Sequence, residues 1–61
     1  MTLAERYNAE ARRMFPRGYE DLLVDPELES VSVIHDMVEM RARVLGDIAS
    51  TVLDNVLRAS E

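Results

Sequence analysis

The sequence predicts an all-α protein built as a helical hairpin, and three observations support this fold class. Apolar residues recur at helical spacing, two segments begin with helix-capping residues, and no pair of segments offers matching strand edges. With 61 residues, the chain is long enough for one domain, residues 1–61. We expect a short helix over about residues 3–15, a loop over about 16–25 and a long helix over about 26–59.

The first helix begins with a capping box. Thr2 is followed three residues later by Glu5, and this spacing lets each side chain satisfy a free backbone N–H group of the other residue. The helix then carries one apolar stripe, formed by Leu3, Tyr7, Ala11 and Met14. Pro16 ends the helix, because the residue before a proline avoids α geometry.

The connection after the first helix is long enough to reverse the chain direction. Gly18 is the natural place for a positive φ, and the apolar run 22–24 is expected to pack against the helices and to add a short helical turn. An arginine and two aromatic residues in this region resemble an interface hot spot, so we consider a partner-binding loop. The alternative is that they cover the open end of the bundle. These residues are Phe15, Arg17 and Tyr19.

The second helix has two candidate starts. Residues 25–27, Asp-Pro-Glu, supply an N-cap, a proline at the first helical position and an acid near the positive end of the helix dipole. Ser30 is a competing N-cap, which would leave 26–30 as a separate turn. From Val31 the apolar pattern continues to about Ala59, which corresponds to a helix roughly 45 Å long.

The long helix carries more apolar surface than the short helix can cover. A helix that is apolar over much of its circumference needs burial on several sides, so we expect two copies to form a dimeric four-helix bundle. Small residues recur every four positions and would let another helix approach closely: Ala42, Gly46 and Ser50. The expected dimer interface consists of Ile34, Val38, Arg41, Leu45, Ile48, Val52, Asn55 and Val56.

Two polar residues interrupt this apolar face. For Arg41, three interpretations compete: its head group reaches solvent beside the stripe, it pairs with a carboxylate across the dimer, or it binds an anionic ligand. Asn55 is a second candidate for setting the register of the dimer. The alternative for Asn55 is exposure near the end of the helix.

One small group has metal-ligand character. His35 and Glu39 are four residues apart on one flank, with Asp36 beside them. A zinc or di-iron site needs more histidine or a Glu-x-x-His step, so we expect an ordinary His35–Glu39 pair and no metal or other cofactor. One histidine, no cysteine and no glycine-rich phosphate loop also leave no catalytic arrangement, and we expect no enzyme.

Charge is unevenly distributed. Residues 1–18 contain four arginines and two acids, a balance of +2, whereas residues 19–61 contain three arginines and ten acids, a balance of −7. The overall charge of −5 disfavours a protein that binds nucleic acid by neutralising phosphates. The first six residues already contain an acid and a base, so we expect no signal peptide. With no apolar run of membrane-spanning length, we also expect no membrane contact and a cytoplasmic location.

These observations favour a non-enzymatic module for protein–protein interaction, a small homodimeric regulator or adaptor. One alternative is an accessory subunit that becomes ordered on binding a larger complex. A less favoured alternative is a small nucleic-acid-associated regulator that uses the N-terminal arginines.

Overall fold

Three α-helices and one short 3₁₀ helix make up the described part of the chain, residues 1–59 of a computed structural model, which contains no strand. The elements are α1 (Leu3–Met14), η1 (Tyr19–Asp21), α2 (Val31–Leu45) and α3 (Ile48–Ala59). The all-α class predicted from the sequence is confirmed. The overall dimensions are 23 × 21 × 20 Å.

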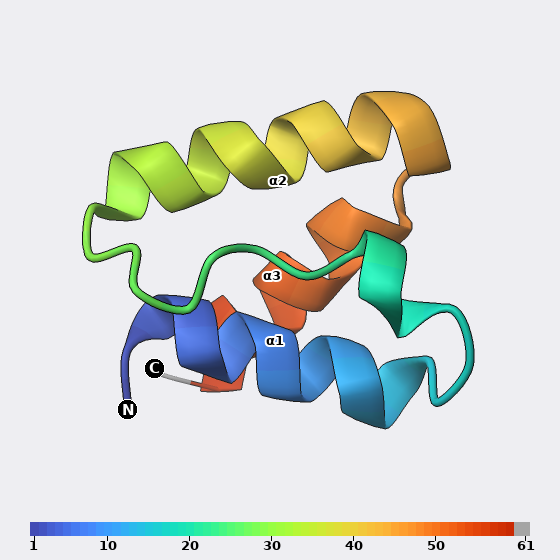
Figure 1. The fold of residues 1–61 in the computed structure, drawn as a ribbon, viewed down its shortest axis with the longest axis horizontal. Coiled ribbons are helices and arrows are strands. Elements are labelled where there is room, and N and C mark those ends of the chain that lie inside the picture. The colour runs from blue at the N-terminus through green and yellow to red at the C-terminus, as the bar shows by residue number, and fades with distance from the viewer. Residues whose placement is uncertain (60–61) are drawn as a thin grey trace.

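The third helix, α3, is the centre of the arrangement. It packs against both α1 and α2, which lie on opposite sides of it, and the segment between η1 and α2 crosses the space between α1 and α2 (Figure 1). The core therefore collects side chains from all three helices and from this crossing segment. Its buried apolar members are Ala4, Tyr7, Ala11, Leu22, Val24, Ile34, Val38, Ala49, Val52 and Leu53.

The long second helix predicted over residues 26–59 is wrong at its start and in its middle. The competing cap is the one used: the Ser30 side chain accepts a hydrogen bond from the Val33 N–H at 3.4 Å, and α2 begins at Val31. Asp25 instead caps a separate turn, in which its carboxylate accepts from the Glu27 N–H at 2.9 Å. This arrangement matches the alternative in which residues 26–30 precede the helix.

The break in the middle occurs at Gly46. Its backbone angles, φ 87° and ψ −169°, lie in a region that is essentially restricted to glycine. The next residue, Asp47, starts a new helix, because its carbonyl accepts hydrogen bonds from both the N–H and the hydroxyl of Thr51. The chain therefore turns back on itself, and the expected two-helix hairpin is replaced by three helices within one chain.

The predictions about local signals in the first third of the chain are confirmed. The Thr2–Glu5 capping box is present with both hydrogen bonds, at 3.0 and 3.2 Å. The first helix ends at Met14, two residues before Pro16, and Gly18 has a φ of 84° in the left-handed region. These features depend on residues close together in the sequence, so they need no tertiary contact to form.

The apolar run 22–24 is held in the core by hydrogen bonds between its backbone and two side chains of α1. The buried Tyr7 hydroxyl donates to the Leu22 carbonyl at 2.8 Å, and burial raises the pKa of this hydroxyl. The buried Asn8 amide makes two bonds to Val24: its Nδ2 donates to the carbonyl at 2.9 Å, and its Oδ1 accepts from the N–H at 3.0 Å. Together, Tyr7 and Asn8 replace the backbone partners that a strand or a helix would have supplied.

Replacing Gly46 by alanine is expected to destabilise the fold through backbone strain alone. Apart from the neighbouring residues in the chain, no atom lies within 4 Å of a Cβ built at Gly46 or at Gly18, so the cost of an alanine at either site comes from its dihedral angles. Gly18 has left-handed angles that cost an alanine about 1–2 kcal/mol, whereas those of Gly46 cost up to about 3 kcal/mol. Urea unfolding followed by circular dichroism should show a larger loss for Gly46→Ala than for Gly18→Ala. Equal losses would mean that the break does not depend on glycine.

The Asn8 amide should contribute more to stability than the other asparagine of the chain. Asn8→Ala leaves the Val24 N–H and carbonyl buried without partners, and each such group costs about 1–3 kcal/mol. Asn55→Ala is the matched control, because its bonds are a part-buried one to sulfur and exposed ones to the side chains of Arg58 and Glu10, and no buried backbone group loses its partner. Thermal unfolding at neutral pH should separate the two variants by several degrees, and a milder effect at Asn8 would contradict the anchoring role.

Candidate interaction surface

One face of α2 exposes apolar side chains that no other part of the described structure covers. On a helical wheel they lie within about 60° of one another, along a line of nearly three turns. We call this set the α2 apolar stripe; it consists of Val33, Met37, Met40 and Val44. Val33 is 41% exposed, Met40 57% and Val44 83%, while Met37 is half-buried against the core.

The stripe exists because α2 uses a different face for its own core. Ile34 and Val38 point into the molecule and are almost fully buried, and they lie roughly 100° around the helix from the stripe. The polar face, which carries Asp36 and Glu39, lies on the other flank of the stripe. The stripe is therefore bordered by the core on one side and by charges on the other.

A shallow hollow continues the stripe at the C-terminal end of α2. It has a volume of about 420 Å³ and lies between Asp21 of η1 and the last turns of α2, where Met40, Val44 and Leu45 line it together with Arg41. The hollow extends the apolar surface toward η1, with one acid and one base at its edges.

Most of the residues predicted to form a dimer interface lie inside this chain's own core or at its edge. Four of them are at most 5% exposed: Ile34, Val38, Val52 and Val56. Leu45 is half-buried against the same core, and Ile48, in the first turn of α3, is 39% exposed. A second copy can reach the buried four only if this fold opens, because they lie where α3 packs against the other two helices.

Arg41 is held by the crossing segment. Its Nη2 donates to the Leu23 carbonyl at 3.1 Å, while its Nε is buried and has no hydrogen-bond partner. The three consecutive carbonyls of Leu22, Leu23 and Val24 thus accept from Tyr7, Arg41 and Asn8 in turn. The bond to Leu23 was not among the three interpretations of Arg41 drawn from the sequence, because the position of that carbonyl depends on the tertiary fold.

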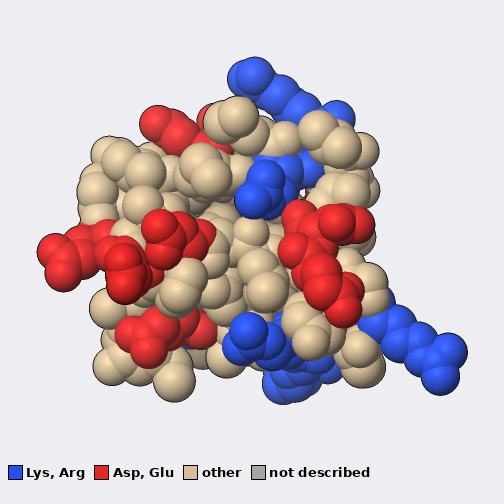
Figure 2. All heavy atoms as spheres, in the orientation of Figure 1, with Lys and Arg blue, Asp and Glu red and all other residues tan. Residues whose placement is uncertain are grey.

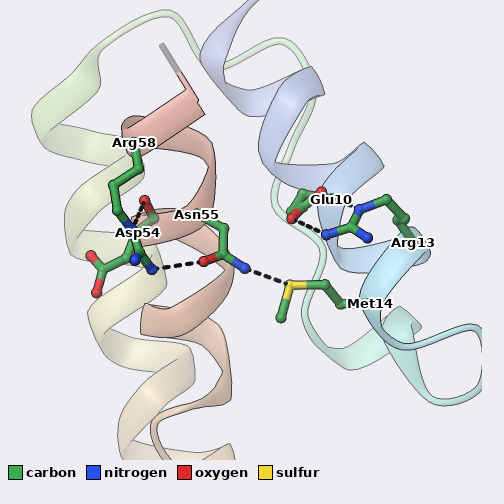
Figure 3. Close-up of polar contacts among 6 residues, drawn as sticks. All are labelled: Glu10, Arg13, Met14, Asp54, Asn55 and Arg58. Carbon is green, nitrogen blue, oxygen red and sulfur yellow. Dashed lines mark hydrogen bonds and ion pairs between the residues drawn. The ribbon is translucent and has the colours of Figure 1, made fainter. Parts of the chain in front are cut away.

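Asn55 also makes its contacts within the chain, at the seam between α1 and α3 (Figure 3). Its Nδ2 donates to the Met14 Sδ at 3.2 Å, and its Oδ1 accepts from Arg58 at 2.8 Å. On the α1 side of the seam, Arg13 pairs with Glu10 at 2.7 Å, and this pairing holds the pKa of the Glu10 carboxyl below its usual range. Of these contacts, the bond from Asn55 to Met14 joins the two helices of one copy, and the others lie within one helix.

The loop considered for partner binding is only partly exposed. Phe15 and Tyr19 are half-buried, and Phe15 packs against the core, whereas Arg17 is exposed. The guanidinium of Arg12 lies over the Tyr19 ring, 5.7 Å from its centre, so this aromatic face already has a cationic neighbour. The packing of Phe15 fits the alternative in which the loop covers an end of the helices.

His35, Asp36 and Glu39 lie together on the exposed flank of α2. Their potential ligand atoms are within 4.8 Å of one another, and the His35 Nδ1 contacts the Glu39 Oε1 at 3.2 Å. The predicted His35–Glu39 pair is therefore confirmed as a contact. All three side chains are exposed, and such groups are common on helix surfaces without a metal.

Charge changes sign along α2. Along the upper edge of the molecule in Figure 2, acidic side chains lie on the left and basic side chains on the right. On α2, the first turn has no acid and the last turn contains Arg43. The charged residues of this surface are Asp36 in the second turn of α2, Glu39 near its middle and Arg43 in its last turn, all exposed. Because Arg41 is turned toward Leu23, Arg43 is the exposed base beside the second half of the stripe.

Comparison with known proteins adds no relative: no family model, curated protein or solved structure matches the chain significantly. None of the helices in the described residues has the length and hydrophobicity needed to cross a membrane.

Sequence reasoning did not single out the α2 apolar stripe as the surface to consider. Its four residues were part of the wide apolar face, but a continuous helix gave no reason to separate them from Ile34 and Val38. Once the core takes those two residues, the stripe is what remains. A usable signal was its regular spacing of four, three and four residues, which is typical of a helix–helix seam.

Proposed function

We propose that this protein is a non-enzymatic helical interaction module, a small regulator or adaptor that associates with a second copy through the α2 apolar stripe. One observation carries the proposal: three of the four stripe side chains are 41–83% exposed on a helix whose core face is already filled. Burying apolar surface of this kind contributes about 25 cal/mol for each Å² removed from water.

The size of the stripe indicates a reversible association. One helix face on each copy buries less area than standard protein–protein interfaces, which places the contact among the weak and transient ones. We expect a dissociation constant on the order of 100 µM, equivalent to roughly 5.5 kcal/mol of binding free energy. Such an affinity suits a module whose association responds to its concentration.

The polar groups favour a binding role over catalysis. The only histidine, His35, pairs with Glu39 on an exposed helix flank, and the chain has no cysteine. Arg41 is the most buried charge near the stripe, and it donates to a backbone carbonyl of its own chain. A catalytic base or nucleophile normally lies in a cleft beside an orienting partner, whereas the His35 side chain is exposed and Arg41 donates to its own backbone.

Replacing Met40 by glutamate should abolish self-association without unfolding the monomer. Met40 is 57% exposed, and methionine and glutamate have similar helix propensities, so the fold tolerates the change while the stripe gains a charge that a dimer would bury. Val31→Glu is the matched control, because Val31 is 61% exposed on the same helix but outside the stripe.

Sedimentation equilibrium between about 10 µM and 1 mM, a range that brackets the expected affinity, is the measurement. The wild-type chain and Val31→Glu should show a monomer–dimer equilibrium, and Met40→Glu should remain monomeric with an unchanged circular dichroism spectrum. A wild-type chain that stays monomeric up to 1 mM, or a Met40→Glu variant that associates like the wild type, would refute the proposal.

A further inference from the structure

We infer that the two copies of α2 pack antiparallel across a two-fold axis that passes between Met37 and Met40. This inference rests on the proposed self-association and adds to it the orientation of the partner copy and the residues that select it. It is carried by two independent features of the exposed surface of α2, the order of the apolar residues and the positions of the charges beside them.

The α2 apolar stripe reads the same in both directions. Its residue types run Val, Met, Met, Val, and its spacings are four, three and four residues. A two-fold axis perpendicular to the helix therefore places Val33 opposite Val44 of the partner subunit and Met37 opposite Met40 of the partner subunit. This is the self-complementarity that an isologous interface requires, with small side chains at both ends and flexible methionines in the centre.

The charges beside the stripe are nearly symmetric about the same axis: the midpoint of Asp36 and Arg43 lies one residue, about 1.5 Å, from it, which long side chains span. Asp36 and Arg43 lie on the same flank, within about 20° of each other on the helical wheel, and both are exposed. In the antiparallel arrangement, Asp36 of one copy faces Arg43 of the partner subunit, and the axis generates the pair twice. Opposite charges at these flanking positions are the usual determinants of orientation in paired helices.

A parallel arrangement matches these positions poorly. It would bring Asp36 toward Arg41 of the partner subunit, but Arg41 donates to the Leu23 carbonyl of its own chain and its Nε is buried. Arg43 would then face the apolar part of the partner instead of an acid. A parallel pair also aligns the two helix dipoles unfavourably, whereas an antiparallel pair places opposite partial charges side by side.

Disulfide trapping can report the orientation, because the chain has no native cysteine. In the antiparallel dimer, position 33 faces position 44 of the partner, while the two copies of position 44 are about 16 Å apart along the helix axis. That separation is far beyond the roughly 7 Å between Cα atoms that a disulfide can bridge. Val33→Cys, carrying a tag that changes its mass, should therefore form a mixed disulfide with untagged Val44→Cys.

Charge reversal tests the flanking pairs. Asp36→Arg and Arg43→Asp should each weaken the dimer by roughly three- to tenfold, because each loses two exposed ion pairs and places like charges together. The double variant should recover the wild-type affinity. The double variant has the same net charge as the wild type, so its recovery cannot result from a change in the overall charge of the chain.

The outcomes separate this inference from the proposed function. Disulfides between Val44→Cys chains alone, formed as readily as the mixed product, or a double charge reversal that stays as weak as the single variants, would overturn the antiparallel arrangement while leaving a dimer. Absence of dimer in the wild-type sedimentation experiment would instead overturn the proposed function itself. A dominant mixed disulfide together with recovery in the double charge variant would support the antiparallel dimer.

Discussion

The structure depends on one backbone conformation, the glycine-specific φ and ψ of Gly46. Without this break, α2 and α3 would form a single rod, and the apolar residues Ile34 and Val52 would lie roughly 27 Å apart along it, too far to share one core. With it, α3 folds back between α1 and α2, and both side chains become fully buried. The reversal thus lets a chain of 61 residues, near the lower size limit for a hydrophobic core, bury most of its apolar surface by itself. The cost is a position that only glycine occupies without strain.

The second requirement is a set of partners for the crossing segment, which has no ladder or helix to satisfy its backbone. Three consecutive carbonyls receive one side chain each, from Tyr7 and Asn8 on α1 and from Arg41 on α2. This explains why a charge sits within an otherwise apolar face of α2: the guanidinium reaches across to the segment that separates the two helices. This bond adds to the burial of Ile34 and Val38, which sets the orientation of α2 about its own axis and leaves the stripe exposed.

Local signals were readable from the sequence, and the tertiary reversal was not. The Thr2–Glu5 box and the positive φ of Gly18 are set by residues a few positions apart, so both were predicted correctly. The break at Gly46 was missed because the apolar pattern continues in phase across it, and a glycine inside a helix costs only about 1 kcal/mol. Its signal was local all the same: a glycine followed by Asp47 is a typical helix stop and helix start. The continuous apolar pattern favoured one long helix over a break at Gly46. The choice between one long helix and two packed helices depends on packing against α1, which the sequence does not display.

The same reversal changes the meaning of the excess apolar surface in the sequence. If residues 26–59 formed one continuous helix, the excess apolar surface would be available for a dimer interface that includes Ile34 and Val38. In the folded chain, these two residues are buried in the core of the same copy. The surface left for association is the α2 apolar stripe, and its pattern is regular. Its residue types are symmetric, its spacing is helical, and its flank carries an acid toward one end and a base toward the other. Apolar residues that are exposed only because the core is too small to bury them need not be symmetric about the middle of α2. A surface that binds a second copy across a two-fold axis must be self-complementary. The physical case for self-association therefore rests on the pattern of the exposed residues more than on their amount.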